Sequence, residues 1–357
     1  MEKPFKDLKV VELANVLAGP AVGMFFAELG AEVVKIENKK TGGDVTRSWK
    51  LPSENRDSEI SAYYASVNWN KKIHFLDLAD NADKQKVYDL IKAADVVITN
   101  YKKGDDTKLG MDFETLKKTN PSLIYGHISG FGDSSRTAFD LVLQAETGFM
   151  FMNGNNESGP LKMPVALIDV LAAHQLKEGI LVALIQRMKT GKGAKVSVSL
   201  YDAAIASLAN QASNWLMAKH DPQPSGSLHP NIAPYGEIFE TQDKALVVLA
   251  VGSDKQFRNL CDILGKKELP DDLRFADNVS RVKNRGTLFS LLNESIKNRK
   301  SDALMKQFIE ADVPAGKIRS VKEVLSSEQA SNLILRQNES QALESLRVRT
   351  AIFNINN

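Results

Sequence analysis

Short apolar segments alternate with segments of helical periodicity along much of the chain, and this alternation restricts its fold more than any other feature. Strand-like runs include Val10–Leu13 and Asp95–Asn100, and others lie at residues 33–36, 71–78, 122–129 and 195–200. Helical patterns cover residues 81–95 and 113–118, and a long apolar stripe begins at Val170. This order predicts an α/β protein with a large doubly wound, mostly parallel, Rossmann-like sheet carrying helices on both faces.

A change of composition indicates a second domain. Residues 220–231 concentrate Pro, Gly and Ser, as a boundary segment does. Beyond them, residues 235–251 have the pattern of an antiparallel hairpin turning at Gln242-Asp243, and helical patterns follow at 254–264, 285–297 and 301–311. We therefore predict a large domain over 1–205, completed by 325–357, a smaller α+β domain over 225–315, and linkers at 206–224 and 316–324.

Charge and cysteine content exclude several classes of function. Lys and Arg number 46 against 44 for Asp and Glu, and the resulting net charge of +2 does not indicate a surface that binds nucleic acid or membranes. One cysteine, Cys261, excludes an intrachain disulfide and a Cys-based metal cluster and fits a reducing compartment. No apolar run approaches the ~20 residues of a membrane span. We expect a cytoplasmic protein that binds no metal, nucleic acid or membrane.

The turn after the first strand raises the question of a ligand. Residues 13–37 follow the strand–turn–helix–strand order of a nucleotide-binding unit, but the turn lacks the Gly-x-Gly-x-x-Gly sequence that holds a dinucleotide pyrophosphate. Taken alone, the turn at Val16-Leu17-Ala18-Gly19-Pro20 is typical of a packed structural connection without a ligand. A ligand here would have to be recognised in another way.

Several motifs, in order, resemble the class III CoA-transferase family. They are "LKVVELANVLAGPAVGMFFAELGAEVVKIE", "ADVVITNYKKG", "TGKGAKVSVSLYDA" and "HPNIAPYGEIF", and the resemblance extends from about Leu8 to about Ala315. It implies that coenzyme A, as acyl-CoA, and small carboxylic acids are the substrates. It also implies an interlocked homodimer, in which each chain threads its partner. The resemblance further implies that the first turn contacts coenzyme A through Val16, Leu17 and Ala18.

Asp169 has two interpretations. Without the family, an Asp ahead of an amphipathic helix is most often an N-cap, which contributes ~1 kcal/mol. By resemblance, Asp169 occupies the place of the nucleophilic aspartate of the transferases. The two roles are compatible, because orphan N–H groups at a helix N-terminus stabilise a carboxylate and an oxyanion beside it. We favour the nucleophile, which would pass through an anhydride to a covalent aspartyl-CoA thioester.

The pair Phe139-Asp140 distinguishes the branches of the family. The racemase branch carries His-Asp at this place, and racemisation requires an acid and a base on opposite faces of the α-carbon. Phe139 cannot transfer a proton, so the pair favours a transferase, with Asp140 as a second catalytic candidate or as a plain helix-start carboxylate. An acyl-CoA racemase or isomerase, and a catalytically silent CoA-binding protein, stay open as alternatives.

The resemblance also implies a set of residues that bind coenzyme A. A lysine taken singly is most often solvated surface, but the pyrophosphate and 3′-phosphate of coenzyme A call for cations near the pocket. Asn38 departs from the pattern, because formyl-CoA-transferring members have arginine there. Besides the first turn, the implied set is Asn38, Lys71, Leu76, Asn100, Tyr101, Lys102, Lys108 and Phe139.

Two further departures bear on the active site. Formyl-CoA-transferring members cover the aspartate with a run of glycines, where this chain has "PSGSLHP" at residues 224–230. The chain also ends at "RVRTAIFNINN", without the Gly-x-His-Thr-like segment of many members. We therefore expect either a short variant or a differently built carboxyl-terminal part of the site.

Overall fold

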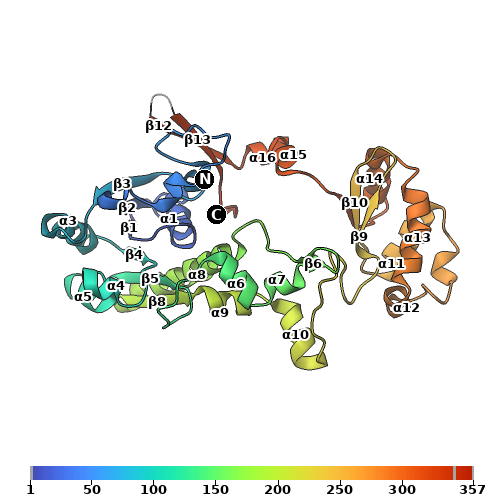
Figure 1. Cartoon of the computed structure of the whole chain (residues 1–357), viewed down its shortest axis with the longest axis horizontal. Coiled ribbons are helices and arrows are strands. Elements are labelled where there is room, and N and C mark those ends of the chain that lie inside the picture. Colours follow the sequence, from blue (N-terminus) through green and yellow to red (C-terminus); the bar gives the residue numbers. More distant parts are fainter. Residues whose placement is uncertain (1–2, 341–342, 356–357) are drawn as a thin grey trace. The chain divides into compact units, whose positions relative to one another are not determined.

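The structure is a computed structural model that describes residues 3–340 and 343–355 (Figure 1). It contains two compact units. The first comprises the described residues of 1–149, 162–212 and 328–357, and the second comprises 150–161 and 213–327. The chain passes between them four times: within α7 (Phe149–Met152), after Leu161, within α10 (Ala209–Ala218) and after Ser327. The segment predicted as the 206–224 linker thus contains α10.

The first unit is built on a parallel sheet, which confirms the predicted fold class. Among the described residues the sheet has six strands in the order β3-β2-β1-β4-β5-β8, and every pairing is parallel. The chain adds β2 and β3 on one side of β1 and then returns to add β4 on the other, as doubly wound folds do. The strands are β1 (Lys9–Glu12), β2 (Glu32–Asn38), β3 (Lys71–Leu76), β4 (Val96–Thr99), β5 (Ile124–Ser129) and β8 (Ala194–Ser199).

Helices cover both faces of this sheet. α1 (Ala18–Glu28) and the long α8 (Leu167–Thr190) pack on one face, in a core that includes Val10, Phe26 and Ile180. α3 (Asn81–Lys92) and α5 (Phe113–Thr119) pack on the other, around Val97 and Ile91. The remaining helical segments are η1 (Lys39–Thr41), η2 (Val45–Ser48), α2 (Ala62–Ala65), α4 (Asp105–Leu109), α6 (Asp140–Glu146) and α9 (Leu200–Ala206).

The carboxyl-terminal segment returns to the first unit. It contains α16 (Glu328–Ser331) and a hairpin of β12 (Ile334–Ser340) and β13 (Leu343–Val348), for which the sequence patterns gave no prediction. The Glu28 carboxylate on α1 accepts the backbone N–H groups of Thr350 and Ala351 at 2.9 and 2.7 Å. Ala351 is buried in the same core as α1, so this segment is an integral part of the unit.

The second unit has the predicted α+β pattern. β9 (Tyr235–Glu240) and β10 (Leu246–Ala250) form the predicted antiparallel hairpin, and β11 (Ala315–Lys317) adds a third strand. Its core includes Phe239, Phe257 and Phe308. The helices and short strands are α11 (Asp254–Leu264), η3 (Leu269–Asp271), α12 (Asn278–Lys283), α13 (Arg285–Ile296), α14 (Ser301–Glu310), α15 (Val321–Leu325), β6 (Gly154–Asn155) and β7 (Gly159–Pro160). The segment predicted as the 316–324 linker overlaps β11 and α15.

Candidate functional site

A cavity of about 680 Å³ lies in the first unit, at the carboxyl ends of β1, β4 and β5 and beside β8. β1 and β4 are neighbours from which the chain runs to opposite sides of the sheet. The crevice outside the strand ends at such a switch point is where open α/β sheets bind their ligands. The turn after β1 lines the cavity at residues 15–18, and the segment after β4 lines it at residues 100–104.

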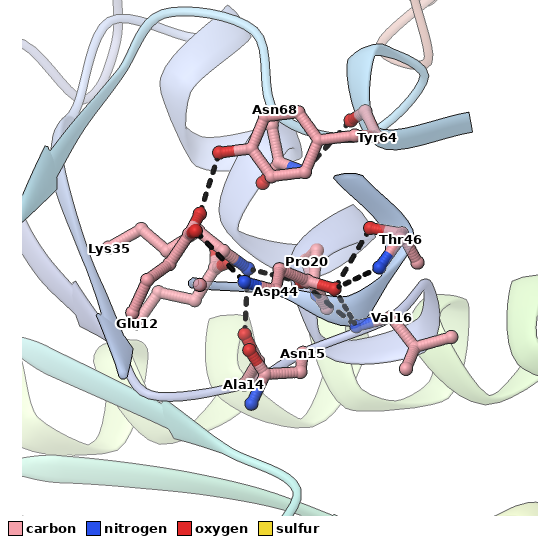
Figure 2. Close-up of polar contacts among 12 residues, drawn as sticks. Glu12, Ala14, Asn15, Val16, Pro20, Lys35, Asp44, Thr46, Tyr64 and Asn68 are labelled. Carbon is pink, nitrogen blue, oxygen red and sulfur yellow. Dashed lines mark hydrogen bonds and ion pairs between the residues drawn. The ribbon is translucent and has the colours of Figure 1, made fainter. Parts of the chain in front are cut away.

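The turn after β1 has a strained backbone, which is held by hydrogen bonds with Asp44 and Asn100. Val16 has φ of +72°, a left-handed conformation that costs a β-branched residue about 1–3 kcal/mol. Its N–H donates to both oxygens of Asp44, at 3.3 and 3.1 Å (Figure 2). The neighbouring Asn15 donates its N–H to Asn100 Oδ1 at 3.1 Å and accepts from Asn100 Nδ2 at 2.8 Å. The turn thereby joins β1 to the end of β4.

Small residues in α1 serve packing within the protein. A Cβ on Gly19 would lie 2.3 Å from the Ala14 side chain, and one on Gly23 would lie 1.8 Å from Glu12 Oε2. Both glycines are therefore required by their neighbours in the protein, without reference to a ligand. Ala18 is also buried in the core of this unit.

A cluster of buried charges lies behind the turn (Figure 2). Lys35 Nζ contacts Glu12 Oε1 at 2.9 Å and Asp44 Oδ2 at 3.1 Å, and Lys71 Nζ contacts Glu12 Oε2 at 2.7 Å. The side chains of Glu12, Lys35, Asp44 and Lys71 are fully buried in these pairs. When both lysines are protonated, the two lysines and two carboxylates balance in charge, which a buried ionic group needs.

The cluster shifts the pKa values of its lysines in opposite directions. Burial opposes the charge of Lys35, but the Glu12 and Asp44 carboxylates outweigh it and raise the pKa. Burial dominates at Lys71 and lowers its pKa to about 7, against the opposing pull of Glu12. Lys71 also donates to Pro20 O and Asn68 Oδ1, at 2.8 and 3.0 Å. The partners of Lys71 Nζ therefore all lie inside the protein.

Asp169 lies in the first turn of α8 and lines the cavity. The helix begins at Leu167 with Ala166 as the N-cap, so the N-cap interpretation of Asp169, with a helix starting at Val170, is wrong. The Asp169 side chain is 8% exposed. Burial, and secondarily the negative charge of Asp140, raises its pKa to about 7. The carboxyl group is thus buried, close to a cavity and half ionised near neutral pH.

Asp140 supplies the cap that α8 lacks. It is the first residue of α6, and its Oδ1 accepts the Ile168 N–H at 2.7 Å. Its Oδ2 accepts from Gln144 Nε2 at 2.7 Å, and Gln144 Oε1 in turn accepts the Met163 N–H at 2.8 Å. Both oxygens are occupied by protein donors, so Asp140 acts on Asp169 through position and charge.

A hydrogen-bond chain fixes the orientation of His127, which also lines the cavity. Tyr125 Oη donates to Met111 O at 3.0 Å, and Thr99 Oγ1 donates to Tyr125 Oη at 3.2 Å. Thr99 Oγ1 is then an acceptor for His127 Nδ1 at 2.9 Å, which assigns the ring proton to Nδ1. Burial and the nearby Lys195 charge lower the His127 pKa, which favours the neutral imidazole, whose acceptor nitrogen in this tautomer is Nε2.

The cavity gathers most of the residues that the sequence implied, and five do not line it. One of these is Asp140, which caps α8 as described above. Asn38 is exposed at the end of β2, and Leu76 is buried in the core on the α3 face. Lys71 belongs to the buried cluster, and Lys108 is exposed and paired with Asp105 at 3.1 Å. Those that line the cavity are Val16, Leu17, Ala18, Asn100, Tyr101, Lys102, Phe139 and Asp169.

Other lining residues were not predicted from the sequence. Asn15 follows β1 and His127 lies in β5, and position at the carboxyl end of a parallel strand could have indicated both. Arg136 and Lys195 join Lys102 and Lys103 as lining cations. Asp44 does not line the cavity but contacts the turn that does. The sequence Asp-Val-Thr indicates that Asp44 caps a helical turn, but nothing in the sequence pattern indicates its contact with Val16.

Within residues 3–340 and 343–355, no group of three or more His, Cys, Asp or Glu side chains could hold a metal ion. No helix in that same part of the chain combines the length and apolar character needed to cross a membrane.

Comparison with known proteins defines the family. The model of CoA-transferase family III matches residues 5–356. The succinate–glutarate CoA-transferase of Agrobacterium fabrum is 39% identical over 341 residues, 93% of this chain and 84% of that protein. The acetyl-CoA:oxalate CoA-transferase of Acetobacter aceti is 32% identical, over 93% of this chain and 86% of that protein. The chain belongs to CoA-transferase family III, which confirms the resemblance. Such enzymes use acyl-CoA as a substrate.

Solved structures agree with this assignment. A crystal structure of a CaiB/BaiF family protein from Brucella suis superposes with a TM-score of 0.84 at 37% identity. The match covers 99% of this chain and 93% of that chain.

Proposed function

We propose that this protein moves coenzyme A from an acyl-CoA donor to an acceptor carboxylic acid through a covalent aspartyl-CoA thioester on Asp169. The observation that carries the proposal is a buried carboxylate that lines the cavity at the carboxyl ends of the parallel strands. Family membership supports the reaction class. Asp140 and the first turn of α8 set the position of the carboxylate.

The reaction proceeds by four acyl transfers. An Asp169 oxygen attacks the donor thioester carbonyl, the C–S bond breaks, and an acyl-aspartyl anhydride and CoA thiolate result. The thiolate attacks the aspartyl carbonyl, which releases the donor acid as its carboxylate and leaves the aspartyl-CoA thioester. The acceptor carboxylate then attacks this thioester to form a second anhydride and thiolate. The thiolate attacks the acceptor acyl carbonyl, giving the new acyl-CoA and the free Asp169 carboxylate.

The environment of Asp169 suits a nucleophile. Burial raises its pKa to about 7, so near neutral pH about half of the molecules carry an ionised and poorly solvated carboxylate. Weak solvation favours attack on a carbonyl. The same exclusion of water protects the anhydride from hydrolysis.

The cavity lining supports binding of anionic substrates. Lys102, Lys103 and Lys195 supply cations for the coenzyme A phosphates and for carboxylate groups, whereas the fourth lining cation, Arg136, is already paired with Glu146. The backbone of Val16, Leu17 and Ala18, with Asn100, Tyr101 and Phe139, forms the proposed coenzyme A contact. The relatives are named for succinate, glutarate and oxalate, so we propose small dicarboxylic acids as donor and acceptor acids.

The proposal includes an interlocked homodimer in the cytoplasm. Three apolar side chains of α8, Val182, Ile185 and Met188, are 55–86% exposed and need a covering surface in solution. The single cysteine, Cys261, is consistent with a reducing compartment. Light scattering coupled to gel filtration would test the dimer.

One experiment tests the reaction. The protein is incubated with succinyl-, glutaryl- and acetyl-CoA and a panel of mono- and dicarboxylates, and chromatography follows the thioesters formed. Intact-protein and peptide mass spectrometry follow covalent coenzyme A. We expect new thioesters only when an acceptor is present, and a coenzyme A adduct on Asp169.

Two variants complete this test. Asp169→Asn should lose transfer by at least ~1,000-fold and show no adduct. Asp302→Asn should retain activity, because Asp302 has a comparable place in the first turn of α14 but an exposed side chain. Transfer by Asp169→Asn within a few-fold of the wild type would refute the nucleophile.

A further inference from the structure

We propose that Asp44 is a positioning residue that holds the Val16 turn in its left-handed conformation before coenzyme A binds. This inference rests on the proposed function, because it assumes that the turn contacts coenzyme A. A β-branched residue does not keep a positive φ without an external constraint. The constraint on the Val16 N–H is the Asp44 carboxylate, at 3.3 and 3.1 Å.

Asp44 is surrounded by donors. Besides the Val16 N–H, its Oδ1 accepts from Thr46 N at 3.1 Å and from Thr46 Oγ1 at 2.8 Å, and its Oδ2 pairs with Lys35 Nζ at 3.1 Å. The Asp44 N–H donates to Glu37 Oε2 at 2.9 Å. The residue is 2% exposed. A carboxylate, which only accepts, is the one side chain of this size that satisfies every neighbour.

The buried cluster fixes the turn at three backbone groups (Figure 2). Lys35 Nζ donates to Ala14 O at 2.8 Å, ahead of the turn, and Lys71 Nζ donates to Pro20 O at 2.8 Å, after it. Asp44 holds Val16 between these two points, and Glu12 joins the two lysines. The charged side chains of the cluster therefore hold the backbone of the turn from inside the protein, while residues 15–18 of the same turn line the cavity.

A turn held in this way is organised before a ligand arrives. Folding already offsets the entropic cost of ordering residues 15–18 and the strain energy at Val16. The binding of coenzyme A therefore does not have to offset them. The role of Asp44 is thus to increase affinity for coenzyme A without touching it.

The variant Asp44→Asn tests this role. An amide keeps the shape but turns an N–H₂ group toward one of the donors around it, so the hold on Val16 weakens. We expect at least a ~10-fold loss of coenzyme A affinity by calorimetry. Without ligand, we expect faster hydrogen exchange in a peptide that spans residues 13–22. The control is Asp112→Asn, since Asp112 accepts from the N and Oγ1 of Thr115 in the same manner but lies outside the cavity lining.

Two further variants keep the test decisive. Thr46→Val removes a single bond to Asp44, and it should cause a two- to three-fold loss of affinity even if Asp44→Asn fails to fold. Val16→Gly in the Asp44→Asn background should recover at least a third of the lost affinity on a logarithmic scale, because glycine adopts a positive φ freely.

The outcomes separate the inference from the proposed function. Unchanged exchange in residues 13–22 of Asp44→Asn, or a loss of affinity equal to that of Asp112→Asn, overturns the positioning role. A wild type that binds no coenzyme A refutes the proposed function, while the exchange measurement still reports whether Asp44 holds the turn.

Discussion

The carboxylate of Asp140 accepts the backbone N–H of Ile168 at 2.7 Å, one residue before the proposed nucleophile Asp169. A single side chain therefore caps the first turn of α8 and places a negative charge beside Asp169. The cap fixes the backbone that carries the nucleophile. The charge favours the protonated form of Asp169 and contributes to its raised pKa.

The rate of transfer should rise with pH through about 7. The reaction needs ionised Asp169, whose pKa is raised to about 7 by burial and by the charge of Asp140. We expect kcat/KM, which reports the free enzyme, to increase from pH 5.5 to pH 8 with a midpoint near the Asp169 value. A profile that is flat over this range would contradict the raised pKa.

Asp140→Asn should move that midpoint to lower pH. The amide removes the negative charge and leaves an oxygen to accept the Ile168 N–H, at the cost of the bond from Gln144 Nε2, so burial alone continues to raise the Asp169 pKa. A full pH–rate profile of the variant checks this. If the midpoint does not move while overall activity falls, Asp140 acts only through the cap.

Asp169→Asn should stabilise the protein, increasingly so at higher pH. The folded-state pKa of Asp169 lies above its unfolded value, so its favourable contribution is present at low pH and is lost as pH rises through about 7. An amide does not ionise, so the variant does not lose this stability as the pH rises. Between pH 5 and pH 8, we expect the variant to gain about 2–3 kcal/mol in unfolding free energy relative to the wild type. Denaturant titrations at both pH values measure it, with the exposed Asp302→Asn expected to show no such trend.

The protein should not exchange the α-proton of an acyl-CoA at a catalytic rate. Phe139 lines the cavity with an exposed ring and offers no acid or base for a second face of the α-carbon. Mass spectrometry of a 2-methylacyl-CoA incubated in D₂O without an acceptor acid checks this. Rapid incorporation of deuterium would favour the isomerase alternative.

Gly23→Ala should destabilise the first unit through the buried cluster. The added Cβ would meet Glu12 Oε2 at 1.8 Å, where Glu12 pairs with Lys35 and Lys71. We expect a loss of about 1–3 kcal/mol, as for other overpacked sites, seen as a lower Tm. Gly286→Ala is the matched helical control, because a Cβ there meets no atom within 4 Å and alanine favours the helix. Equal Tm values for the two variants would show that the cluster tolerates displacement.

Much of the sheet could be predicted because buried strands and helices have a regular spacing of apolar residues in the sequence. β4 is buried at every position and apolar at its first three, and the polar segments between strands mark the connections. The carboxyl-terminal hairpin could not be predicted in this way, because the buried positions of β13 are the polar residues Ser345 and Arg347, whereas Leu346 and Val348 are exposed. Its fold depends on contacts with α1 and with Trp69-Asn70, more than 260 residues earlier in the chain.

The site was less predictable because it depends on contacts between distant segments. Lys71 has the sequence context of a solvated lysine, yet pairs with Glu12 in the interior. Asp44 lies in a polar loop that contains no hint of the strained Val16 opposite it. Strand-end position, in contrast, is a property of the sheet, and it accounts for Asn100 and Asn15.

The return of the carboxyl-terminal segment to α1 sets an order of events during synthesis. The first unit is interrupted by residues 213–327, and its last pieces, including the Ala351 side chain in its core, leave the ribosome after the whole second unit. Domains fold as units during translation, so the second unit can fold while the first still lacks the hairpin and the partners of Glu28. A chain released before Glu328 would thus contain the whole second unit but an unfinished first one, with part of the apolar core of the first unit uncovered.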